Sequence, residues 1–103
     1  MANNIFLEGR ICKRPTFRVT PRGREIAELL IAIDRPYGKT DRIPCIAWES
    51  EARKTRIMGI DDRVRINGRI QSRTYSKKIN ETESEWRTAY EVSVNDINLS
   101  EAF

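Results

Sequence analysis

The feature that most constrains the fold is the strict alternation of side chains over residues 63–75, RVRINGRIQSRTY. The odd positions carry arginine, amide or tyrosine side chains: Arg63, Arg65, Asn67, Arg69, Gln71, Arg73 and Tyr75. The even positions carry apolar or small side chains: Val64, Ile66, Gly68, Ile70, Ser72 and Thr74. Because successive side chains of a β-strand point to opposite faces, this period of two predicts a strand with one buried face and one basic face.

The dipeptide Asn67-Gly68 offers a competing interpretation, since it is the strongest short-range signal for a β-hairpin. A two-residue turn there would pair Ile66 with Arg69. Paired residues share a face of the sheet, so each apolar residue would lie across from a cation. A continuous strand keeps the apolar residues together, and we predict one strand with Gly68 as a bend or bulge.

The rest of the chain is organised as short strands separated by turn residues. We predict strands over residues 4–18 (bent near Gly9), 25–35, 42–48, 61–75 and 86–99, with loops at 36–41 and 76–85. A short charged helix is predicted over residues 49–58, with Gly59 as its C-cap. This order predicts an all-β protein formed by one domain, residues 1–103, folded as a five-stranded Greek-key OB-fold barrel.

The chain does not resemble an enzyme. It contains no histidine, which removes the commonest general base and the commonest nitrogen ligand for a metal. The pair Asp61-Asp62 at the start of a strand is better explained as a solvated turn than as a catalytic pair. Cys12 and Cys45 are far apart and form no CxxC motif, so we expect two small buried thiols, no metal site and no cofactor.

The sequence also indicates where the protein resides. Its first residues, MANNIFLEGR, lack the basic and long apolar regions of a signal peptide, and no stretch approaches the length of a membrane span. Free cysteines fit a reducing compartment. We therefore expect a cytoplasmic, nucleoid-associated protein without membrane contact.

Charge is segregated along the chain, although the formal net charge is only +4. All ionisable side chains of residues 63–78 are basic apart from Tyr75, whereas Glu81, Glu83 and Glu85 follow directly. Aromatic residues lie among the cations at Tyr37, Trp48 and Tyr75. Such a surface suits a single polynucleotide strand, because every base can stack on a ring while the phosphates contact cations.

Each of these features has a simpler structural explanation. Trp48 could plug the end of the barrel, and the residues leave that alternative open. Tyr37 and Tyr75 could be surface residues. The arginine face could be an ordinary solvated face, or charge on an edge strand that prevents aggregation. Trp86 is in register with the apolar residues of the fifth strand and is predicted to lie in the core.

Taken together, several stretches resemble the bacterial single-stranded-DNA-binding protein family over about residues 4–99. They are FLEGRICKRPTFR, TPRGREIAELLIAIDR, IPCIAWESEA, DDRVRINGRIQSRTY and YEVSV. The resemblance implies an OB fold that coats single-stranded DNA in replication, recombination and repair, usually as a homotetramer, with Tyr37, Trp48 and Tyr75 at base-stacking sites. The predicted nucleic-acid-binding residues are Tyr37, Trp48, Tyr75, Arg35, Lys39, Arg42, Arg63, Arg65, Arg69, Arg73, Lys77 and Lys78.

The sequence departs from the family pattern at three places. A stacking site that is usually aromatic falls on Arg42, whose guanidinium could stack in place of a ring. The acidic residues at 81, 83 and 85 give the distal half of their loop a lesser role in holding DNA. The sequence ends at LSEAF, with no acidic-tipped tail through which replication proteins would be recruited. These departures fit a short or accessory member, or the related dimeric primosomal replication protein.

Three functional hypotheses remain. The first is a sequence-tolerant binder of single-stranded DNA that forms a homo-oligomer, tetrameric or alternatively dimeric. The second is a replication-restart accessory protein that acts mainly through protein partners. The third is an RNA-binding OB domain, since nothing in the sequence predicts how a 2′-hydroxyl would be treated.

Overall fold

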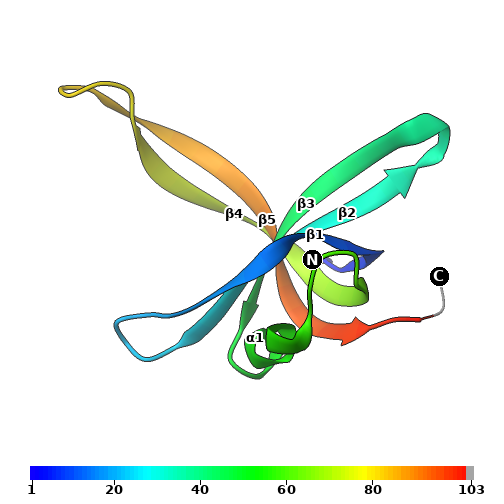
Figure 1. Ribbon diagram of the computed structural model, residues 1–103. Coiled ribbons are helices and arrows are strands. Elements are labelled where there is room, and N and C mark those ends of the chain that lie inside the picture. The colour runs from blue at the N-terminus through cyan, green and yellow to red at the C-terminus, as the bar shows by residue number, and fades with distance from the viewer. Residues whose placement is uncertain (102–103) are drawn as a thin grey trace.

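The computed structural model describes residues 1–101, so the terminal Phe103 lies outside the described residues. Five strands form one closed barrel in the order β1-β2-β3-β5-β4, with β1 pairing antiparallel to both β2 and β4 (Figure 1). The elements are β1 (Ile5–Val19), β2 (Glu25–Arg35), β3 (Lys39–Trp48), α1 (Ser50–Lys54), β4 (Arg63–Lys78) and β5 (Ser84–Leu99). This order, with the helix between β3 and β4, confirms the predicted OB architecture.

The core is built by the alternation that the sequence shows. On β2, Ala27, Leu29 and Ile31 are buried and Ile33 is partly buried, as predicted. Val64 and Ile66 of β4 meet them in the same cluster, together with Ile11 of β1 and Ile97 of β5. The odd positions at the start of β4 remain exposed. The barrel therefore has a buried inner side, while the basic side chains of β4 face outward.

β4 runs without interruption through Asn67 and Gly68, so the predicted continuous strand is confirmed and the hairpin is excluded. The pairing register with β5 shifts between Asn67 and Gly68, but the extra residue at this shift is Asn95 of β5, so Gly68 lies beside the bulge and is not itself the bulged residue. A Cβ at Gly68 would lie 2.2 Å from the carbonyl oxygen of Ser93, so the two backbones approach too closely for a side chain. In β1 the register shifts fall between Ile11 and Thr16 rather than at Gly9.

The helix is shorter than predicted. α1 spans Ser50–Lys54 and is followed by a 3-10 turn, Thr55–Ile57, so the predicted C-cap role of Gly59 is wrong. In the segment between the helix and β4, the residue with a positive φ is Asp61 and not Gly59. Asp62 accepts a hydrogen bond from the N–H of Gly59 at 2.8 Å, so Asp61-Asp62 shapes a turn.

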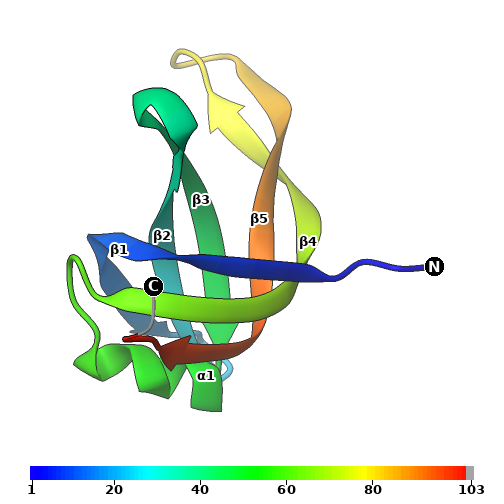
Figure 2. The same ribbon diagram turned by 90° about the vertical axis from the view of Figure 1, so that its right-hand side faces the viewer.

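Two hairpins extend beyond the barrel from the same end (Figure 2). We call them the β2–β3 arm and the β4–β5 arm, and Figure 1 shows them diverging. The β4–β5 arm is longer than predicted, because pairing continues to Lys78 and Ser84 and leaves only residues 79–83 as the turn.

The prediction that Trp86 lies in the core is wrong, since this side chain is 75% exposed. Its register was assigned correctly, because it lies on the same face of β5 as the buried Val92 and Val94. That face is covered only within the barrel, and Trp86 lies farther out on the β4–β5 arm.

Candidate nucleic-acid interface

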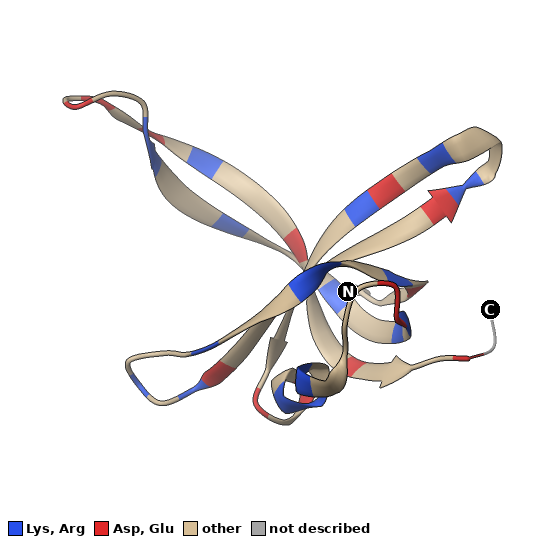
Figure 3. Cartoon of the chain, in the orientation of Figure 1, with Lys and Arg blue, Asp and Glu red and all other residues tan. Residues whose placement is uncertain are grey.

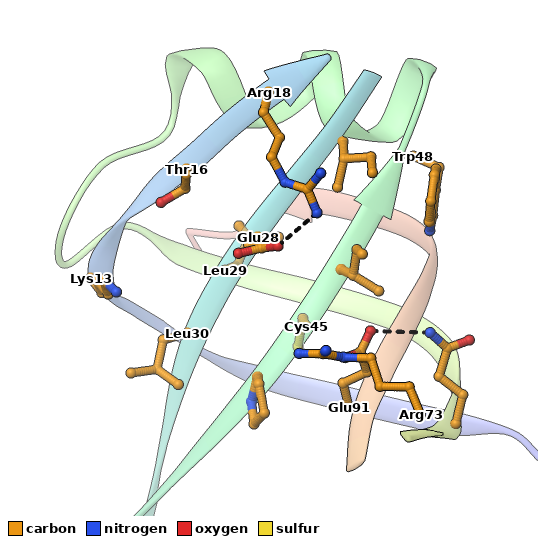
Figure 4. Close-up of a pocket in the computed structure, with 14 residues that line it drawn as sticks. Lys13, Thr16, Arg18, Glu28, Leu29, Leu30, Cys45, Trp48, Arg73 and Glu91 are labelled. Carbon is orange, nitrogen blue, oxygen red and sulfur yellow. Dashed lines mark hydrogen bonds and ion pairs between the residues drawn. The ribbon is translucent and has the colours of Figure 1, made fainter. Parts of the chain in front are cut away.

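An open groove of about 440 Å³ crosses the outside of the barrel. β3 and β5 pair only at Cys45–Val92 and Ile46–Ser93, so the two arms diverge on either side of a short contact. The lining residues are Lys13, Thr16, Arg18, Ile26, Glu28, Leu29, Leu30, Pro44, Cys45, Ile46, Trp48, Gln71, Arg73 and Glu91 (Figure 4). All five strands of the barrel contribute to it.

The floor of the groove is apolar, for a reason visible in β3. Cys45 and Ala47 point into the core, which turns Pro44, Ile46 and Trp48 outward. Cross-strand pairing places Leu30 of β2 opposite Pro44. The groove thus offers an uncharged surface against which flat rings can pack, with polar groups on its flanks.

Trp48 lies at the end of this floor and is half-buried. The guanidinium of Arg24 lies 4.5 Å from the centroid of its ring and donates a hydrogen bond from Nε to Glu49 at 3.1 Å. A cation in this position is attracted by the electrons of the indole. Trp48 is therefore neither part of the buried core cluster nor fully exposed, and its role in base stacking stays a prediction.

On the side of the groove formed by β4 and β5, a buried carboxylate binds and positions two neighbouring side chains. Glu91 is only 8% exposed, and it accepts hydrogen bonds from Arg73 Nε at 2.7 Å and from Gln71 Nε2 at 3.1 Å. The hydrogen bond to Glu91 raises the pKa of Arg73 above its ordinary value. Arg73 is thus held in place while its side chain stays largely exposed. Burial, and secondarily the charge of Glu91, raises the pKa of Cys45 to about 12.

The side of the groove that β1 forms was not predicted from the sequence. Lys13, Thr16 and Arg18 face the groove, and Arg18 pairs with Glu28 at 3.1 Å (Figure 4). The register shifts in β1 place these side chains on one face although their spacing is irregular. A search for period two misses such residues, because the irregular register of β1 against β2 decides which of its side chains face the groove.

The predicted site residues are divided among three regions. Trp48 and Arg73 line the groove, and Tyr75 continues the same face of β4, with its ring centroid 5.7 Å from the Arg73 guanidinium. Lys77 follows on that face, whereas Lys78 lies on the opposite face of the β4–β5 arm. Figure 3 shows the acidic residues gathered at the tip of this arm.

The β2–β3 arm carries the second group. Tyr37 is fully exposed at its tip and adopts a positive φ of 65°. Arg35 pairs with Asp41 at 3.0 Å, and Lys39 begins β3 beside them. Arg42 lies opposite Ala32, on the face of β3 that also carries the groove residues Pro44 and Ile46.

The third group lies away from the groove. Arg63 and Arg65 belong to the half of β4 that pairs with β1, and Arg65 donates a hydrogen bond to Glu8 at 3.2 Å. Arg69 does not belong to this group, because it pairs with Ser93 at the start of the β4–β5 arm and lies on the same face of β4 as the groove residues Gln71 and Arg73. The row of arginines that is continuous in the sequence is therefore divided by the curvature of the barrel.

Other kinds of site are not found within residues 1–101. No group of three histidine, cysteine or acidic side chains is arranged to hold a metal. Cys12 and Cys45 are free thiols, but only Cys45 is buried, so the prediction of two buried thiols is wrong for the partly exposed Cys12. None of the helices in this part of the chain is long and apolar enough to cross a membrane.

The barrel topology and the outward-facing groove define an OB-fold domain. Residues 2–100 match the model of the Single-strand binding protein family, and the chain belongs to this family. It is 32% identical over 88 residues to the Single-stranded DNA-binding protein of Halalkalibacterium halodurans, covering 73% of this chain and 49% of the relative. It is 30% identical to Single-stranded DNA-binding protein A of Bacillus subtilis, covering 76% and 49% of the two chains.

Protein B of the same organism is 29% identical over 85 residues, which cover 76% of this chain and 75% of the relative. The chain thus spans about half the length of the first two relatives and three quarters of the third.

Proposed function

We propose that this domain is a non-enzymatic, sequence-tolerant binder of single-stranded DNA that protects exposed strands in replication, recombination or repair. The observation that carries the proposal is the half-buried Trp48 at the end of an apolar groove flanked by guanidinium groups. Membership of the Single-strand binding protein family supports it, as do the names of the relatives.

In this mechanism aromatic rings contact the bases, and cationic side chains contact the phosphates. Bases stack on Trp48 in the groove, on Tyr75 of the β4–β5 arm and on Tyr37 of the β2–β3 arm. Phosphates are neutralised by cations on the groove flanks and the arms, among them Lys13, Arg18 and Arg73. Neither kind of contact reads base edges, which explains tolerance of sequence.

We also propose that the protein assembles with copies of itself in the cytoplasm, at the nucleoid. β1 pairs with β4 from Ile5 to Arg10, but its pairing with β2 begins only at Arg10. The other edge of this first segment can therefore add a symmetry-related strand. Light scattering combined with a titration of dT length would report assembly and site size together.

The test of the proposed function is a fluorescence titration with dT oligomers. Replacing Trp48 by alanine should weaken binding by about 1–3 kcal/mol, the range measured for a stacked base. Matched rU oligomers distinguish DNA from RNA binding. Affinity of Trp48→Ala equal to that of the unmodified protein would refute stacking in the groove.

A further inference from the structure

The β4–β5 arm has a second face, opposite the one that continues the groove. We call it the inner face of the arm, because it continues the core side of β5. Trp86 is 75% exposed there and Tyr90 is 65% exposed, and Ile70 of β4 is also exposed. These are large apolar side chains with no covering element in the described chain, and exposed aromatic residues in such positions mark interaction surfaces.

The pairing register places polar but uncharged groups around these rings. Trp86 lies opposite Ser76, and Tyr90 opposite Ser72. Between them Thr88 lies opposite Thr74. The inner face therefore alternates rings with hydroxyl groups, which can donate hydrogen bonds to phosphate or sugar oxygens.

The charge of the inner face is positive. Lys78 lies opposite Ser84, one cross-strand pair beyond Trp86 on the same face. Glu85 and Glu91 lie on the other face, where they pair with Arg87 and Arg73. From Ile70 to Lys78 and from Ser84 to Tyr90, the inner face carries no carboxylate.

We propose that the inner face of the arm is a second contact surface for single-stranded DNA, a proposal that rests on the function proposed above. Trp86 and Tyr90 stack on bases and Lys78 contacts a phosphate. Four residues of an extended strand span about 13 Å, so the two rings contact different bases. A bound strand then touches both faces of the β4–β5 arm rather than the groove face alone.

A second copy of this chain is a less suitable occupant of the inner face. Protein interfaces are depleted of lysine and serine at their centres. Here Ser72, Ser76 and Lys78 are interspersed with the rings. Rings, hydroxyl groups and a cation without a carboxylate match a polyanion that carries bases.

The chain contains two tryptophans, Trp48 in the groove and Trp86 on the inner face, so tryptophan fluorescence can report on each surface separately. In Trp48→Phe, all tryptophan emission comes from Trp86, and in Trp86→Phe all of it comes from the groove. We expect saturating dT to quench the emission of both variants. The double variant Trp86→Ala/Tyr90→Ala should bind dT at least five-fold more weakly. Ile79→Ala is the matched control, because Ile79 is an exposed apolar side chain in the turn of the same arm and outside the inner face. This variant should bind dT with unchanged affinity.

The outcomes separate this inference from the proposed function. Quenching of Trp48 with unchanged Trp86 emission, together with full affinity of the double variant, would overturn the inner-face contact and leave the groove intact. Absence of dT binding by the unmodified protein at low salt would overturn both. Emission of Trp86 that changes with protein concentration in the absence of DNA would assign the face to a second copy and overturn the proposal. Circular dichroism of each variant checks that the barrel is folded.

Discussion

At the scale of single residues, the groove holds cations that are already paired with carboxylates. Arg18 pairs with Glu28, and both side chains are about half exposed. Exposed pairs of this kind contribute little to stability. A phosphate that approaches Arg18 must therefore compete with Glu28, and the carboxylate also repels the strand. We therefore expect Glu28 to lower the affinity of the groove for an anion and to contribute little to the stability of the fold.

Replacing Glu28 by glutamine should tighten dT binding and increase the steepness of its salt dependence, because Arg18 is released and one negative charge is removed. Fluorescence titrations at several salt concentrations measure both quantities. Glu8→Gln is the matched control, since Glu8 pairs with Arg65 outside the groove. If only the Glu8 variant bound more tightly, the strand would follow the β1–β4 surface instead.

The Cys45 thiol gives a second prediction at this scale. Its folded pKa is raised to about 12 from an ordinary value of 9.0, chiefly by burial. Between these values the unfolded chain loses the proton while the folded chain keeps it, so stability falls as the pH rises. The expected loss is at most about 1.4 kcal/mol per pH unit. Urea unfolding at pH 8 and at pH 10.5 measures this loss. The free energy of unfolding should decrease less between the two pH values for Cys45→Ala than for the unmodified protein, and equal decreases would contradict the assignment.

At the scale of elements, β4 depends on a glycine for its close approach to β5. An added Cβ at Gly68 would meet the backbone of Ser93, which cannot move as a side-chain end can. Gly68→Ala should therefore destabilise the protein by about 1–3 kcal/mol, as overpacking usually does. Urea denaturation measures the loss. Gly59→Ala is the control, because nothing lies within 4 Å of its added Cβ; similar losses in both variants would argue against the steric explanation.

Strands could be predicted from the sequence because alternation reports which face of a strand is apolar. The limits of β2 and the continuity of β4 follow directly from it. Alternation does not report how far the barrel extends, which is why Trp86 was assigned to the core. Nor does it give the register between strands, and the link from Glu91 to Arg73 and the β1 flank of the groove both depend on register.

At the scale of the whole molecule, the net charge of +4 says little about where a polyanion binds. Cations occur on both arms, on β1 and on the half of β4 that pairs with it (Figure 3). Two paths are therefore available to a strand. One follows the groove and the arms, and the other follows the β1–β4 surface that carries Arg63 and Arg65.

Salt dependence distinguishes the two paths, because each lost phosphate contact to a single strand reduces the slope of log K against log salt by about 0.7. The double variant Arg69→Ala/Lys77→Ala removes cations from the groove side of β4, and should reduce the slope by about 1.4. Arg63→Ala/Arg65→Ala removes the same charge from the β1–β4 surface and should leave the slope unchanged. The reverse result would move the strand to that surface. Equal reductions would mean that the strand passes around the barrel, and the arginines that alternate along β4 would then form one continuous binding track after all.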